Sequence, residues 1–149
     1  MKKIAVIGTG LSALSLAYHL PALDITFFEK SWRPGGRIST RKHNQYAFDH
    51  GAHYLKLDHG IIGLNEYLNK IDAIKILKGQ FCSNISQNSP IEDKEIIVGK
   101  KGNESIPINI HKSLHYPTYF SKQITSIETI NKEYYLIAGE EKFGPFDYI

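Results

Sequence analysis

The sequence contains a single cysteine, Cys82, among its 149 residues. One thiol cannot form an internal disulfide, and without a second cysteine the chain has no Cys pair for a zinc site. A chain without disulfides suits a reducing compartment, so a cytoplasmic location is expected. No apolar run reaches the roughly 18 residues that a membrane span requires, so no membrane partner is expected.

An excess of charge of one sign is also missing. Lysine and arginine number 18 against 15 aspartate and glutamate, a formal net charge of +3. The lysines are dispersed along the chain, and the pattern gives no reason to expect a nucleic-acid partner. At this length and with 42% hydrophobic residues, the chain is expected to form one domain, residues 1–149, with a hydrophobic core.

Three histidines, His50, His53 and His59, lie close enough together to raise the question of a metal site. Their segment has the pattern of a strand and a loop, and no cysteine or carboxylate set completes a tetrahedral site. No metal is therefore predicted.

The first thirty residues have the pattern of a βαβ unit. Residues 2–8 (KKIAVIG) form a short β-branched run that ends at a glycine, as in a buried parallel strand. Residues 11–20 carry apolar side chains near helical spacing, and Pro21 ends that segment. Residues 24–30 (DITFFEK) form a second strand-like run, so a right-handed crossover is expected.

The turn between the first strand and the helix reads GTGLSA, a GxGxxA form of the dinucleotide-binding fingerprint. Gly8 permits a tight turn, and Gly10 lacks a Cβ, so a pyrophosphate can approach the backbone. Ala13 is small enough for the helix to lie close to the strand. The N-terminus of the helix then offers free N–H groups and a favourable dipole to an anion.

Glu29 supports this interpretation because it ends the second strand, nineteen residues after Gly10. A carboxylate there can accept hydrogen bonds from both ribose hydroxyls, and it would repel a 2′-phosphate, which disfavours NADP. An ordinary surface acid at a strand end is the alternative. A signal peptide, the other interpretation of the first twenty residues, needs neither the glycine turn nor the acid.

A second glycine motif, Arg33-Pro34-Gly35-Gly36-Arg37, follows a few residues later. Paired glycines allow a close approach of the backbone to a ligand, and Arg37 can form bidentate, charge-assisted bonds to a pyrophosphate. A flexible loop with a surface arginine would explain the glycines but not the presence of both motifs.

With this second motif the sequence resembles flavoproteins of the glutathione-reductase-type FAD fold, in the amine-oxidase branch. Within that branch, FFEKSWRPGGRISTRK followed by FDHGAHYL looks most like renalase and its bacterial relatives. The resemblance implies an α/β fold: a Rossmann-like FAD/NAD(P)-binding domain with a parallel sheet and an antiparallel β-meander. It implies FAD as cofactor and a small-molecule redox substrate, either a dihydronicotinamide or an amine, whose hydride passes to the flavin and then to oxygen or another acceptor.

The resemblance also implies cofactor-binding residues, but it identifies no catalytic acid or base. His53 departs from the family pattern, since relatives commonly carry glutamine there, and a histidine titrates near neutrality. The implied contacts are Gly8, Gly10, Ser12 and Ala13 for the pyrophosphate, Glu29 for the adenosine ribose, Gly36 and Arg37 for the pyrophosphate and ribityl chain, Gly51, Ala52, His53 and Tyr54 for the isoalloxazine, and Ile124 for adenine.

The remaining segments are expected to be more varied. Residues 46–55 and 95–99 are strand-like, residues 61–71 and 106–114 are expected to be helical, and residues 80–93 are expected to form a loop. A meander is predicted over residues 119–146, with turns at Asn131-Lys132 and Gly139-Glu140.

Residues 147–149 look like the start of a strand that returns to the parallel sheet. Members of the resembled family are longer, so the chain is expected to stop before the substrate domain is complete and to be a poor catalyst alone. A truncated piece, a short natural form and an isolated domain all remain open, as does the oligomeric state. A non-catalytic nucleotide-binding remnant is the alternative function, and the RPGGR loop disfavours an NAD-dependent dehydrogenase domain.

Overall fold

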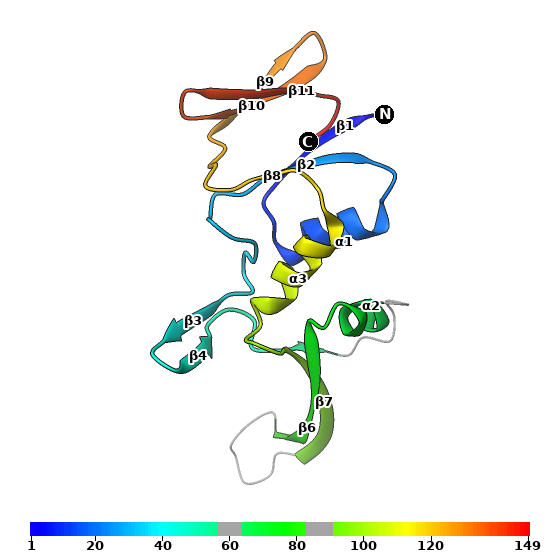
Figure 1. Cartoon of the computed structure of the whole chain (residues 1–149), viewed down its shortest axis with the longest axis vertical. Coiled ribbons are helices and arrows are strands. Elements are labelled where there is room, and N and C mark those ends of the chain that lie inside the picture. The colour runs from blue at the N-terminus through cyan, green and yellow to red at the C-terminus, as the bar shows by residue number, and fades with distance from the viewer. Residues whose placement is uncertain (57–63, 83–90) are drawn as a thin grey trace.

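The computed structural model describes residues 1–56, 64–82 and 91–149. Its upper part in Figure 1 combines a parallel sheet with an antiparallel meander, and hairpins and the helix α2 form the lower part. Helices α1 (Leu11–His19) and α3 (Ser105–Leu114) lie below the parallel sheet in this view.

The parallel sheet is built around the predicted βαβ unit. Strand β1 (Lys3–Ile7) pairs in parallel with β2 (Asp24–Phe28) from Lys3↔Asp24 to Ile7↔Phe28, and α1 connects them. The third strand is β8 (Thr118–Tyr119), which pairs in parallel with β2. The predicted α/β class, a Rossmann-like parallel sheet accompanied by antiparallel strands, is confirmed.

Both faces of this sheet are buried, which explains why its strands are nearly continuous apolar runs. On β2, Ile25 and Phe27 join one core cluster, whereas Phe28 joins another on the opposite face. The first cluster lies under the helices and includes Leu14, Ala17, Ile106 and Ile110. The second lies under the meander and includes Ala5, Leu136 and Phe146.

The meander has the order β11-β10-β9, from strands β9 (Ser126–Ile130), β10 (Glu133–Ala138) and β11 (Glu141–Phe146). Asn131 and Lys132 form the first turn with φ of 52° and 68°, the pair of positive angles that suits a tight hairpin. The predicted meander and this turn are confirmed.

The last residues return to the parallel sheet, as expected. Tyr148 forms a parallel bridge with Ile4, and its carbonyl accepts a hydrogen bond of 3.0 Å from the Ala5 N–H. The two ends of the chain therefore lie close together in Figure 1.

The lower part contains a hairpin of β3 (Thr40–His43) and β4 (Tyr46–Asp49). A second antiparallel sheet has the order β5-β7-β6, from β5 (Leu55–Lys56), β6 (Ile74–Cys82) and β7 (Ile91–Gly99). Helix α2 (Leu64–Lys70) precedes β6 and falls within the predicted helical segment. Residues 61–63 of that prediction lie outside the described residues, as does His59.

Two expectations for this part were wrong. Residues 80–82 and 91–93 are strand rather than loop, with Gln80 paired to Asp93; residues 83–90 lie outside the described part. Polar, exposed residues on this hairpin remove the alternation by which a strand is recognised. The strand expected over residues 46–55 is interrupted between Asp49 and Leu55.

Candidate dinucleotide-binding site

The first glycine turn leaves β1 directly at the carboxyl end of the parallel sheet. Gly8 has a φ of +100°, which non-glycine residues rarely adopt, and its N–H donates to the Phe28 carbonyl at 2.7 Å. The hydrogen bond fixes the turn to the end of β2, and the positive φ requires a glycine at this position.

Gly10 differs from Gly8 because the chain does not require a glycine there. Its φ of −72° is ordinary, and a Cβ built on it would meet no atom within 4 Å. Gly10 also begins α1, whose first turn has no side-chain cap and no acidic residue. Free N–H groups, the helix dipole and open space beside the backbone together suit an anionic ligand.

The second glycine motif lies directly against the first. The Gly35 N–H donates to the Thr9 carbonyl at 3.2 Å, and Gly35 forms a parallel bridge with Gly10. A Cβ on Gly36 would lie 3.3 Å from the Gly10 Cα. Two motifs separated in the sequence therefore form one glycine-lined surface.

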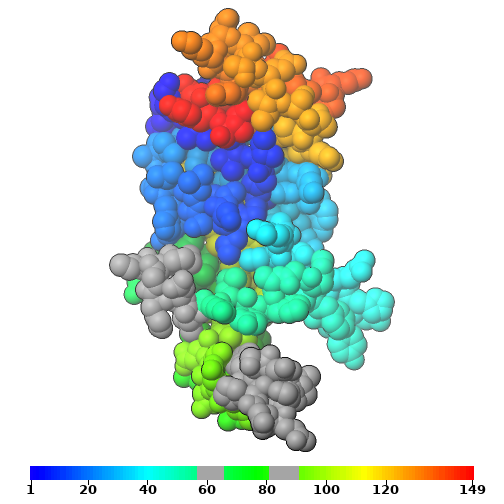
Figure 2. All heavy atoms as spheres, turned by 180° about the vertical axis from the view of Figure 1, so that it is seen from behind, coloured from blue at the N-terminus to red at the C-terminus, as the bar shows by residue number. Residues whose placement is uncertain are grey.

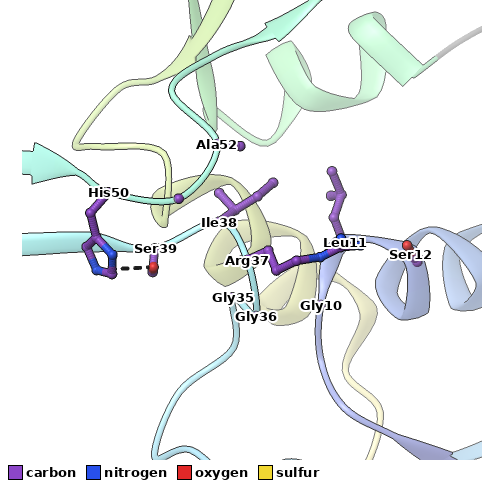
Figure 3. Close-up of a pocket in the computed structure, with 11 residues that line it drawn as sticks. Gly10, Leu11, Ser12, Gly35, Gly36, Arg37, Ile38, Ser39, His50 and Ala52 are labelled. Atoms are coloured by element: carbon purple, nitrogen blue, oxygen red, sulfur yellow. Dashed lines mark hydrogen bonds between the residues drawn. The ribbon is translucent and has the colours of Figure 1, made fainter.

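A cavity of about 830 Å³ opens over this surface, a volume typical of ligand sites. Figure 3 shows the Arg37 side chain extending from the glycine loop toward the start of α1. The third segment of the wall is the turn after β4, where the Ala52 N–H donates to the Arg37 carbonyl at 3.1 Å. The sequence-predicted residues that line the cavity are Gly10, Ser12, Gly36, Arg37, Gly51 and Ala52.

Glu29 is buried, 5% exposed, at the end of β2. Its Oε2 accepts hydrogen bonds of 2.8 Å from both the N–H and the hydroxyl of Thr9, and its Oε1 accepts one of 2.9 Å from the Ser31 N–H. Burial raises the pKa of this carboxyl, but the Ser31 and Thr9 donors outweigh burial and the pKa is lowered.

These three bonds bear on the predicted ribose contact. An ionised carboxylate accepts about four hydrogen bonds, and at Glu29 the backbone and side-chain donors of Thr9 and Ser31 take most of that capacity. Thr9 therefore shares the carboxylate that the sequence alone assigned to two ribose hydroxyls. The sequence reasoning missed Thr9, although its place between the two glycines was the available signal.

The other predicted residues lie outside the cavity wall. Ala13 is partly buried against the helix-side core, as its small size predicts. His53 and Tyr54 are exposed. Ile124 precedes β9 and packs against the core under the meander.

Several wall residues were not predicted from the sequence. The His50 Nε2 lies 3.3 Å from the Ser39 hydroxyl (Figure 3), and both side chains border the cavity. Neither residue carries a recognisable motif. The signal available was their proximity to the two glycine segments, Gly35-Gly36 and Gly51.

Comparison with known proteins finds a family model that matches the first part of this site. Residues 6–68 match the NAD(P)-binding Rossmann-like domain family. The matched range contains both glycine motifs and Glu29.

The chain is also similar to individual proteins and to solved structures. The chain is 43% identical over 54 residues to coproporphyrinogen III oxidase of Staphylococcus aureus (strain NCTC 8325 / PS 47), covering 34% of this chain and 12% of the relative. A structure from Exiguobacterium sp. 255-15, assigned as a protoporphyrinogen oxidase, matches with a TM-score of 0.72 and 12% identity over 99% of this chain and 58% of that one. Putrescine oxidase with bound putrescine matches with a TM-score of 0.69 and 10% identity over 94% and 55%.

The structural matches establish the fold, and the chain spans little more than half the length of those structures. The chain therefore carries a Rossmann-like domain, and the solved structures of a porphyrinogen oxidase and of putrescine oxidase share its fold. No helix among residues 1–56, 64–82 and 91–149 is long and apolar enough to cross a membrane.

Proposed function

We propose that this chain is the FAD-binding part of a flavin-dependent oxidoreductase. The observation that supports it is the contact between the two glycine motifs, Gly8–Gly10 and Gly35-Gly36, with Arg37 and the α1 N-terminus facing one cavity. A Rossmann turn alone would serve NAD equally well. The second motif adds a cation and a second close backbone approach where a pyrophosphate would lie.

The residues divide the work of holding FAD. The N–H groups of α1 and the guanidinium of Arg37 would bind the pyrophosphate, and the Glu29 carboxylate, which Thr9 and Ser31 hold in place, would accept a ribose hydroxyl. The backbone of Gly51 and Ala52 would border the flavin. When bound, FAD supplies a ring that accepts a hydride, and the chain binds and orients it.

The proposal extends to substrate class in the complete enzyme. The resemblance of residues 27–55 to renalase supports a dihydronicotinamide as the hydride donor, and the similarity to putrescine oxidase supports an amine as the alternative. Electrons would then pass to oxygen or another acceptor. A cytoplasmic location is part of the same proposal.

Titration of the purified chain with FAD and with NAD⁺ tests the proposal. We expect yellow protein absorbing near ~450 nm, and tighter binding of FAD than of NAD⁺. Glu29→Ala and Arg37→Ala should each reduce FAD retention, whereas Lys56→Ala, on β5 and outside the cavity wall, serves as the control. A chain that binds neither nucleotide would instead favour a non-catalytic remnant, and one that prefers NAD⁺ would contradict the choice of cofactor.

A further inference from the structure

A series of buried polar contacts lies behind the cavity wall. It begins at Arg33, whose Nη2 is 2.7 Å from Oε2 of Glu104 and donates to the Thr40 carbonyl at 3.3 Å. The Glu104 side chain is 5% exposed and stands at the N-terminus of α3. This ion pair therefore joins the start of the second glycine motif to the start of a helix far away in the sequence.

Thr40 continues the series at the first residue of β3. Its hydroxyl accepts a hydrogen bond of 3.1 Å from the Glu104 N–H and donates one of 2.5 Å to Oδ1 of Asp49. The Thr40 N–H also donates to the Glu104 carboxylate at 3.4 Å. Because Thr40 is 1% exposed and Glu104 is also buried, the polar groups of these two residues depend on one another for hydrogen bonds.

Asn103 carries the series to the other cavity wall. Its N–H donates to the same Oδ1 of Asp49 at 2.8 Å, and its side-chain Nδ2 donates to the Ala52 carbonyl at 2.8 Å. The Asn103 Oδ1 in turn accepts 2.7 Å from the Gly99 N–H. The contacts thus run without a break from the residues before Gly35 to the backbone of Ala52.

We propose that Arg33, Thr40, Asp49, Asn103 and Glu104 form a polar clamp that positions two cavity walls, residues 35–37 and 51–52, for the flavin. The proposal rests on the proposed function, because it assigns these residues to the same cofactor. They are positioning residues: Asn103 donates to the Ala52 carbonyl of one wall, and Arg33 anchors the chain two residues before Gly35 of the other. The clamp holds the walls at the separation that the cofactor requires, so its loss should weaken binding even where the chain stays folded.

A pair of substitutions at Thr40 tests the clamp. Thr40→Val keeps the volume but removes the hydroxyl, so the Glu104 N–H loses its acceptor and Asp49 Oδ1 loses one of its two donors, whereas Thr40→Ser keeps the hydroxyl. We expect Thr40→Val to weaken FAD binding about tenfold and Thr40→Ser to bind FAD nearly as tightly as the parent. Quenching of flavin fluorescence measures both. Melting of each apoprotein shows that binding is measured on folded chain.

A double-mutant cycle provides the second measurement and serves alone if Thr40→Val does not fold. Arg33→Gln and Glu104→Gln should each weaken FAD binding, and the double variant should lose less than the sum because the two residues act as a pair. Glu128→Gln, which removes an exposed ion pair with Lys142 in the meander, is the matched control and should bind like the parent.

The outcomes separate the clamp from the proposed function. A parent chain that binds no FAD overturns the proposed function and the clamp with it. A parent that binds FAD, with clamp variants that melt earlier but bind FAD as tightly when folded, overturns the clamp alone and leaves a structural network.

Discussion

The two glycine motifs beside the cavity are held in place by different parts of the chain. The first, Gly8–Gly10, is fixed within the βαβ unit: by β1 before it, by α1 after it, and by the Phe28 carbonyl at the end of β2. The second, Gly35-Gly36, is fixed by contacts of its flanking residues with segments outside the βαβ unit. Its flanking Arg33 is bound by Glu104, and its Arg37 carbonyl by Ala52.

The two motifs should therefore differ in their sensitivity to substitution. Figure 2 shows the light-blue and cyan residues of the second motif next to the blue residues of the βαβ unit. A local βαβ unit sets the position of a helix N-terminus with few degrees of freedom. A distant support must instead order several loops at once, which costs conformational entropy and makes the second wall more sensitive to substitution.

The largest expected effect on stability comes from a substitution at Gly51, which supports the second motif. A Cβ there would lie 2.0 Å from the Arg37 carbonyl oxygen and 3.3 Å from the Ser39 N, a clash with backbone that no side-chain rotation relieves. We expect Gly51→Ala to destabilise the fold by about 3 kcal/mol. Urea unfolding measures it, and an unchanged midpoint would show that the walls separate freely.

Gly10→Ala makes the opposite change, in the first motif. The new methyl group meets no atom within 4 Å, so stability should fall by no more than about 1 kcal/mol, the cost of a poorer helix cap. FAD binding should weaken at least tenfold, about 1.4 kcal/mol, because the methyl group occupies the space of the pyrophosphate. Parallel unfolding and flavin titrations check it; FAD binding equal to the parent would place the ligand elsewhere.

The sequence was sufficient for what neighbouring residues determine. The βαβ unit, its glycine turn and the meander turn at Asn131-Lys132 all depend on local patterns, and each was predicted at its observed place. Glu29 was predicted at the end of the second strand, but its partner Thr9 was not, since the contact needs the turn to bring them together.

What could not be predicted depends on pairing across long separations. Strand β8 is only two residues long and exists through its register with β2, Phe27↔Thr118 and Phe28↔Tyr119. The contact between Thr40 and Glu104 joins residues 64 positions apart with no motif to mark either. Of the β6–β7 hairpin only residues 95–99 were predicted as strand; the rest was missed because its exposed polar side chains hide a continuous backbone ladder.

A smaller loss of stability is expected from a substitution at Thr9, the residue between the two glycines of the first motif. Thr9→Val removes one of three hydrogen bonds to Glu29 and should cost about 1 kcal/mol of stability. Thr9→Ser keeps the hydroxyl and serves as the control. Thermal melting compares the two; equal losses in both would assign the effect to packing rather than to the hydrogen bond.

The smallest expected effect is the acid dependence that Glu29 confers. Its pKa is lowered from the ordinary value of 4.5 in the folded chain, because burial, which raises it, is outweighed by the Ser31 and Thr9 donors. The ionised Glu29 therefore stabilises the folded chain fully above pH 4.5, and this stabilisation is lost as the pH falls through the lowered folded pKa. Unfolding within that pH interval takes up less than one proton. In Glu29→Gln, the melting temperature should fall less steeply as the pH is lowered below 4.5. Asp147, whose pKa is also lowered, by the Lys2 hydrogen bond, would supply the same dependence, so Asp147→Asn is the control. If Asp147→Asn alone makes this fall less steep, the acid sensitivity belongs to the chain ends rather than to the dinucleotide turn.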